Sequence, residues 1–175
     1  LTCFLHLPLA SGPTTAPAHP TGFARSTEAL SAAGERRHMR MLAGRVIMAG
    51  NAPEGLRDTA GSANRDCRQL IETWLGRSRL HYALTPRFAP TSTPEQLRVA
   101  GQIYADYPSL FMQTHLSENV AELAWIKELY PEAKNYLDVY DSFGLLGERS
   151  VFGHGIHLHE DEIKRLADTG SSVAF

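Results

Sequence analysis

Residues 110–119 read LFMQTHLSEN, and this stretch decides the fold. Residues 110–116 form a largely apolar run of the length of a buried strand, and polar side chains gather at its end, with His115 and Glu118. The residues that follow, 120–130, carry apolar side chains at helical spacing. A buried strand that leads directly into a helix is the repeating unit of a sheet of parallel strands.

The same unit recurs on both sides of this stretch. Further short apolar runs are residues 41–48, 80–89, 150–158 and 171–175. Between the runs, residues 67–74 and 97–107 also place their apolar side chains on one helical face, which needs a sheet to cover. The alternation predicts βα units arranged around a parallel sheet.

Capping signals support three of the predicted helices. Residues 93–96, TPEQ, supply an N-cap threonine, a proline at the first helical position and a glutamine suited to a capping box. Asn119 and Glu122 repeat the box more loosely. Residues 159–162 load negative charge into the first turn of a helix that Gly170 is expected to end.

Two architectures fit this alternation: an open doubly wound sheet and part of an eight-stranded barrel. No G-x-G-x-x-G or G-x-x-x-x-G-K-[ST] motif follows any of the predicted strands, so the usual nucleotide-binding marker of the open sheet is missing. Polar groups instead follow the strands, at residues 51–53, 87–88, 115–118 and 154–157. Catalytic groups collect at the carboxyl ends of barrel strands, so we predict an α/β fold that is a partial (β/α)8 TIM-type barrel.

The composition excludes several classes of function. Apolar residues make up 43% of the chain and charged residues 21%, as in an ordinary globular protein. The 17 Lys and Arg against 19 Asp and Glu give a net charge of −2, so we expect a small-molecule partner and neither nucleic acid nor membrane. Cys3 and Cys67 have no paired spacing, which argues against a disulfide framework and favours the cytoplasm.

The domain organisation follows from a change in composition near residue 24. Residues 1–24 are rich in Pro, Thr, Ser and Gly without a sustained period, and we predict that they are irregular or poorly ordered. Residues 1–10 weakly resemble a signal-peptide core but lack a basic start. We predict that residues 25–175 form the partial barrel domain, and that the chain is a piece of a longer protein.

The first candidate for chemistry is the pair His115 and Glu118. A histidine at the end of a buried strand can hold a zinc ion in the barrel mouth, and a carboxylate three residues later can take a proton from the attacking water and pass it to the substrate. The alternative is a core histidine beside an acid that only stabilises the helix N-terminus.

The second candidate is His154, which stands between two glycines in residues 151–159, VFGHGIHLH. The glycines allow an unusual turn or a close backbone approach, which a strand built only for packing does not need. Alternation along the strand places His157 on the opposite face from His154, and His159 opens the next helix. We therefore select His154 and expect the other two histidines to be structural or exposed.

The third candidate is Arg87 with Phe88, in residues 85–93, TPRFAPTST. An arginine can donate to a carbonyl oxygen and an aromatic ring can stack on a planar base, so the pair suits a purine or a pyrimidine. A solvent-facing arginine beside a core phenylalanine is an equally good interpretation.

Taken in order, these motifs resemble the amidohydrolase superfamily over roughly residues 39–175, and within it the enzymes that deaminate guanine. The resemblance rests on RVIM at residues 45–48, NAPEGLRD at 51–58, LHYALTPRF at 80–88, MQTHLSEN at 112–119 and FGHGIH at 152–157.

The resemblance implies a role for each candidate residue. Arg87 and Phe88 would contact guanine, His115 would bind one zinc ion, Glu118 would relay a proton, and His154 would assist the activated water. It implies hydrolysis of guanine to xanthine and ammonia in purine catabolism, by a cytoplasmic homodimer.

The sequence also departs from the family. Neither the H-x-H pair of the first barrel strand nor the metal-binding aspartate of the eighth is present, and neither His6 nor His19 aligns with the H-x-H strand. We therefore expect that the chain lacks the first and last strands, binds zinc weakly, and deaminates guanine poorly or not at all by itself. The alternatives are deamination of another ring, such as a pterin, a modified purine or a triazine, and a non-catalytic incomplete barrel.

Overall fold

The computed structural model describes residues 16–18 and 24–175. Its seven strands form one sheet in the order β1-β2-β4-β5-β6-β7, with β3 also paired to β4, and every pairing is parallel. The strands are β1 (Ala16–Ala18), β2 (Met41–Ala43), β3 (Val46–Ile47), β4 (Leu80–Pro86), β5 (Phe111–Leu116), β6 (Ser150–His154) and β7 (Ser172–Ala174).

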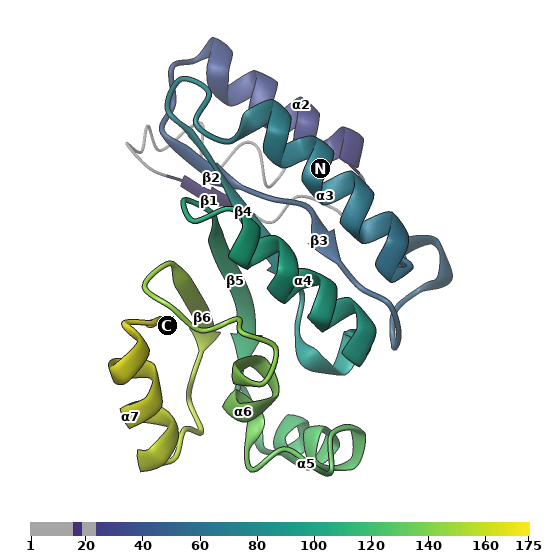
Figure 1. Cartoon of the computed structure of the whole chain (residues 1–175), viewed down its shortest axis with the longest axis vertical. Helices are drawn as coiled ribbons and strands as arrows, with labels where there is room; N and C mark the ends of the chain where they lie inside the picture. The colour runs from purple at the N-terminus through teal and green to yellow at the C-terminus, as the bar shows by residue number, and fades with distance from the viewer. Residues whose placement is uncertain (1–15, 19–23) are drawn as a thin grey trace.

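Helices connect the strands, and in Figure 1 the chain progresses steadily from α2 and α3 at one end to α7 at the other. They are α2 (Ala24–Arg36), α3 (Ala60–Trp74), α4 (Pro94–Asp106), α5 (Val120–Leu129), α6 (Tyr136–Asp141) and α7 (Glu160–Thr169), with short 3-10 turns η1 (Glu54–Leu56) and η2 (Ala89–Thr91). A strand order that follows the chain is the winding of a (β/α)8 barrel, whereas a doubly wound sheet reverses its order. The parallel sheet is therefore confirmed in the part of the chain that the structure describes.

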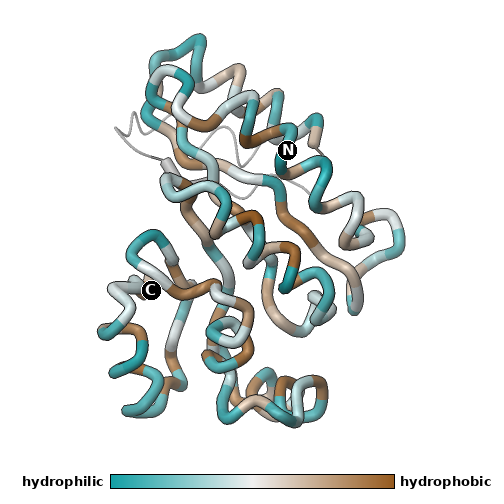
Figure 2. Tube along the Cα trace, in the orientation of Figure 1, coloured by the Kyte–Doolittle hydropathy of each residue, from teal (hydrophilic) through white to brown (hydrophobic). Residues whose placement is uncertain are grey.

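The core lies where the helices cover the sheet. Alternate side chains of the strands pack there, and in Figure 2 the hydrophobic colour follows the central strands and parts of the helices while many outer turns are hydrophilic. The largest fully buried side chains include Tyr82, Tyr140, Phe152, Leu84 and Met112. None of the described helices is long and apolar enough to cross a membrane.

Several features differ from the prediction. The run at residues 41–48 is divided into β2 and β3, and the helix α2 was not predicted. Thr93 caps α4, but the side chain of Gln96 has no hydrogen-bond partner among the described residues, so the second half of the predicted capping box is wrong. β6 ends at His154 instead of continuing to residue 158, because His154 and Gly155 adopt φ values of 74° and 61°. α6 was not predicted, since its six residues are too few to show a helical period.

The predicted irregular segment, residues 1–24, lies mostly outside the described residues, as do Cys3, His6 and His19. Within it the structure describes β1, which pairs in register with β2, and Ala24, where α2 begins.

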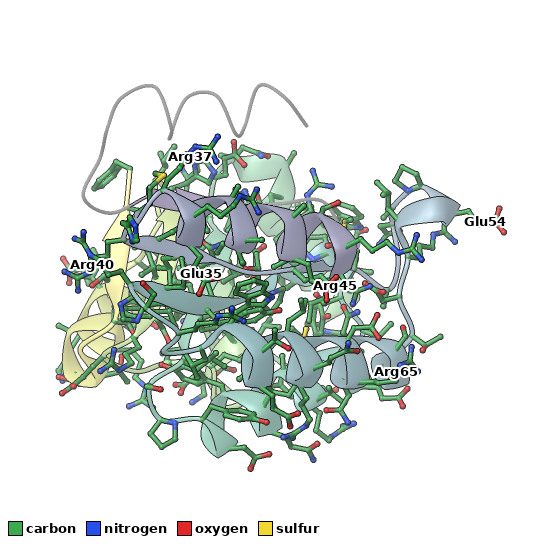
Figure 3. The ribbon with its side chains drawn as sticks, turned by 90° about the horizontal axis from the view of Figure 1, so that it is seen from above. Glu35, Arg37, Arg40, Arg45, Glu54 and Arg65 are labelled. Atoms are coloured by element: carbon green, nitrogen blue, oxygen red, sulfur yellow. The ribbon has the colours of Figure 1, made fainter. Side chains whose placement is uncertain are left out.

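A buried ion pair secures the loop that follows β3. Arg45 is only 5% exposed and pairs with Asp58, while the Asp66 carboxylate lies 3.7 Å from the same guanidinium. Burial raises the pKa of Asp58, and the charge of Arg45 offsets part of that rise. Figure 3 shows Arg45 within the body of the molecule and Glu54 on the short turn η1 at its edge. The pair therefore holds both ends of this loop against the fold.

Candidate active site

The predicted site residues meet at the carboxyl ends of β4, β5 and β6. The parallel register pairs His115 with Gly153 and Leu116 with His154. The backbone N–H of His115 donates to the carbonyl oxygen of Arg87, the residue after β4, at 3.2 Å. Neighbouring parallel strands therefore bring Arg87, His115 and His154 to one edge of the sheet, as the barrel prediction required.

The imidazole of His115 has its proton position fixed by the backbone. Its Nδ1 lies 2.7 Å from the carbonyl oxygen of Arg87. A carbonyl oxygen can only accept a hydrogen bond, so Nδ1 carries the proton and the neutral ring has its lone pair on Nε2. This backbone contact selects the tautomer in which a histidine binds a metal through Nε2, and it also holds the ring in place.

His154 lies against the same imidazole, and Glu118 lies near His154. The rings of His115 and His154 are stacked with centroids 5.4 Å apart and planes at 30°. Nε2 of His154 is 3.6 Å from a carboxylate oxygen of Glu118, longer than a hydrogen bond, and their side chains are 35% and 48% exposed. The structure thus brings the three side chains together and leaves them accessible, which a packed core histidine would not be.

A cavity of about 370 Å³ opens beside the two histidines. Its lining residues are Gln113, Thr114, His115, Val151, Gly153, His154, Ala174 and Phe175. This volume falls within the range of small-molecule sites, about 300–1,000 Å³.

Five described non-glycine residues have positive φ values, and three of them follow β3, follow β5 or end β6. Asn51, Ser117 and His154 have positive φ values of 46°, 50° and 74°, a conformation that costs a non-glycine residue energy. The carbonyl oxygen of Ser117 accepts from the N–H groups of Ile156 and His157, both at 3.1 Å, so the loops after β5 and β6 hold one another. The fold therefore maintains the unusual turn that aims His154.

His157 and His159 lie outside this cluster. His159 opens the next helix as predicted, whereas the reason for His157 differs from the one that the sequence suggested. Because β6 ends at His154, strand alternation does not reach His157, which is half-buried. His159 is exposed and is the N-cap residue of α7, where Glu162 accepts a hydrogen bond from its backbone N–H at 2.9 Å.

Arg87 and Phe88 form a polar and aromatic wall beside His115. The guanidinium of Arg87 lies over the ring of Phe88, 5.5 Å from its centroid, and Arg87 is exposed. The half-buried ring of Phe88 makes edge contacts with His115 at 6.2 Å and with Trp125 at 6.3 Å. Phe88 is thus neither a fully buried core residue nor remote from the histidines.

Two neighbours of the site were missed from the sequence. Trp125 on α5 contacts Phe88, and Tyr140 on α6 donates a hydrogen bond to the carbonyl oxygen of His115 at 2.8 Å. Trp125 lies off the apolar stripe of its helix, and this irregularity was the available signal. Tyr140 acts on a backbone atom, so nothing in the residue pattern pointed to it.

The described residues can supply part of a metal site, but they do not form a complete one. They contain no group of three or more His, Cys, Asp or Glu side chains arranged to hold a metal ion. His115, with its proton fixed on Nδ1, has the form of a single nitrogen ligand. Burial raises the pKa of the Cys67 thiol to about 11, so this cysteine is neither a nucleophile nor a ready ligand.

A model of the amidohydrolase family matches residues 8–175. The chain belongs to the amidohydrolase family. This membership agrees with the strand order and with the position of the site at the carboxyl ends of the strands, and it confirms the predicted partial barrel.

Within this family, the chain is similar to several guanine deaminases. It is 48% identical to guanine deaminase of Escherichia coli (strain K12) over 98% of its own length, but spans only 39% of that protein. The structure of guanine deaminase from C. acetobutylicum with bound guanine matches with a TM-score of 0.91 and 27% identity, over 97% of this chain and 41% of that one. The chain therefore corresponds to about two fifths of each relative.

A more distant solved structure shares the fold. The atrazine chlorohydrolase of Arthrobacter aurescens, solved in complex with zinc, matches with a TM-score of 0.84 at 22% identity, covering 98% of this chain and 40% of that chain.

Proposed function

We propose that the protein to which this chain belongs is a zinc-dependent guanine deaminase, which hydrolyses guanine to xanthine and ammonia in purine catabolism. The observation that carries the proposal is the grouping of His115, Glu118 and His154 beside the Arg87–Phe88 wall. The 48% identity to the Escherichia coli enzyme supports the choice of substrate.

Arg87 and Phe88 bind the purine in this proposal. Guanine offers a planar ring that can stack on Phe88 and a carbonyl oxygen that can accept from the guanidinium of Arg87. The two side chains already lie together, with the guanidinium of Arg87 over the ring of Phe88. Because both residues follow the strand end next to His115, the bound base lies beside the reacting group. Holding two reactants in this way removes much of the entropic cost of the reaction.

Glu118 carries the proton that the hydrolysis must move. A water oxygen forms a bond to C2 of guanine, its proton passes to the Glu118 carboxylate, and Glu118 returns a proton to the amino group, which leaves as ammonia. His154, 3.6 Å from Glu118, is placed to hydrogen-bond the attacking water. The chemistry that a bound zinc ion supplies is a water acidic enough to attack near neutral pH, and His115 would hold the ion through Nε2.

We also propose a cytoplasmic location and a homodimeric assembly for the protein. The location is supported by the single described cysteine, which is a buried free thiol and not half of a disulfide. The dimer follows from the family resemblance alone.

The test measures ammonia and xanthine formation from guanine with added zinc, for the complete gene product and for residues 1–175 alone. We expect activity in the complete protein and little or none in the shorter chain, which contributes one strong zinc ligand. A panel of a pterin, a modified purine and a triazine distinguishes the substrates. A preference for another ring would overturn the choice of guanine, and silence on the whole panel would favour a non-catalytic barrel.

Replacement of Phe88 by leucine should weaken guanine binding. Stacking of a base on an aromatic ring contributes about 1–3 kcal/mol, so we expect KM to rise by about 10-fold while kcat changes little. The matched control is Tyr107→Leu, which removes a half-buried aromatic ring that lies beside Arg68. An unchanged KM in Phe88→Leu would show that Phe88 only packs against its neighbours and does not bind the base.

A further inference from the structure

Tyr140 is a fully buried tyrosine with a saturated hydroxyl group directly behind the site. The hydroxyl donates to the carbonyl oxygen of His115 at 2.8 Å, and it accepts from the N–H of Ala89 at 2.9 Å and from the hydroxyl of Thr114 at 3.1 Å. A phenol offers one proton and two lone pairs, and these three contacts can fill them. The hydroxyl of Tyr136 lies further away, at 3.5 Å, and the hydroxyl of Thr114 also lies 3.2 Å from the carbonyl oxygen of Arg87. Burial also raises the pKa of Tyr140, which keeps the donated proton in place.

These partners belong to the two halves of the proposed site. Ala89 follows Phe88 in the loop that would bind the purine, while Thr114 and His115 belong to the strand that would bind zinc. A single side chain from α6 thereby joins the amide of the loop to the carbonyl of the strand. Loss of the hydroxyl would leave both buried backbone groups without this partner, which is costly.

Among the described residues, the hydrogen bonds of the Tyr130 hydroxyl reach only one of the two halves. Its hydroxyl lies 2.7 Å from the carbonyl oxygen of Ser92 and 3.2 Å from that of Ala89, both in the purine loop. Burial raises its pKa to about 12, so this hydroxyl also remains a donor. Tyr130 is therefore a natural comparison for Tyr140, because its hydroxyl bonds to the loop and, in the described part of the chain, forms no hydrogen bond to the strand of His115.

We propose that Tyr140 is a positioning residue that fixes the purine loop against the zinc-binding strand, whereas Tyr130 positions the loop alone. The inference rests on the proposed function for the identity of the two ligands. The distance between the base and the attacking water depends on both halves, and a misplacement of about 1 Å can cost about 100-fold in rate. The buried hydroxyl thus sets the geometry of the reaction without touching a reactant.

The test compares Tyr140→Phe with Tyr130→Phe in the complete gene product. Tyr130→Phe should raise KM for guanine by about 10-fold and leave the zinc affinity, measured by competition with a chelator, within about 2-fold of the wild type. Tyr140→Phe should raise KM similarly and also lower the zinc affinity by about 10-fold. Amide hydrogen exchange at Ala89 should accelerate most in Tyr140→Phe, because that amide loses its acceptor.

Zinc affinity and activity together decide the inference. Zinc affinity unchanged in Tyr140→Phe, or lowered equally in both variants, overturns it. If Tyr140→Phe does not fold, Thr114→Val removes the hydroxyl that lies 3.1 Å from that of Tyr140 and 3.2 Å from the carbonyl oxygen of Arg87. It should change both constants in the same direction by a smaller factor, and no change in either constant overturns the inference. A wild-type protein that binds zinc but does not deaminate guanine overturns only the proposed function, because zinc affinity and amide exchange still test the role of Tyr140. A wild-type protein that binds no zinc overturns the proposed function and the role of Tyr140 together.

Discussion

Glu118→Gln should lower kcat for guanine by about 10²- to 10⁴-fold, the usual contribution of a general acid and base. The amide has the size of the carboxylate and can still form hydrogen bonds, but it cannot accept a proton from water and deliver it to the amino group. The side chain of Glu118 is 48% exposed and directly follows the strained Ser117, so the substitution leaves the packed core intact. KM and zinc affinity should stay close to wild type.

Steady-state ammonia release, with zinc content measured on the same samples, checks this result. Glu160→Gln is the matched control, because Glu160 is also an exposed acid close to a strand end but lies in the first turn of α7, outside the histidine cluster. The control should retain full activity. Retention of activity by Glu118→Gln would show that Glu118 only stabilises a helix N-terminus, the alternative that the sequence left open.

The fold could be predicted because its signals are local. The run at residues 110–116 corresponds to β5, and the threonine before Pro94 caps α4 as expected. Each of these features depends on the backbone preferences of a few consecutive residues. The order of the strands then follows, because a parallel strand after a helix crossover pairs beside its predecessor.

The extent of burial could not be predicted as well, because it depends on what each helix meets. Helical spacing predicts an apolar stripe along α5 and its C-cap that consists of Val120, Leu123, Ile126, Leu129 and Tyr130. Of these, Ile126 is 3% exposed but Val120 is 66% exposed. Helical spacing places both side chains on one face, but only part of that face contacts the described fold. Trp125, outside the stripe, instead reaches the ring of Phe88.

The side chains of the site could be predicted from the sequence, but the contacts that hold them in position could not. His115, Glu118 and His154 carry their chemistry in their side chains, and strand ends bring them together. The contact that fixes the tautomer of His115 and the bonds of Tyr140 involve backbone atoms distant in sequence. Backbone acceptors leave no trace in residue type, so only coordinates reveal them.

His115→Ala should produce the second large effect, on zinc affinity. Loss of an outer partner of a ligand commonly costs about 10- to 100-fold in metal affinity, so loss of the ligand itself should cost more than about 100-fold. Deamination should fall in parallel, and excess zinc should restore it only in part. Competition with a chelator and metal analysis after dialysis measure the affinity without depending on turnover.

His157→Ala is the matched control for His115→Ala, because it removes a neighbouring imidazole that is not expected to bind zinc. His157 is two residues beyond the strained turn, is half-buried, and contributes its backbone N–H to the carbonyl oxygen of Ser117, a bond that alanine retains. Both variants remove one imidazole from the same region, but only His115 has its Nδ1 held by a backbone carbonyl and its Nε2 left with the lone pair. Weakened zinc binding in His157→Ala with normal binding in His115→Ala would move the ligand to the other histidine and contradict the tautomer argument.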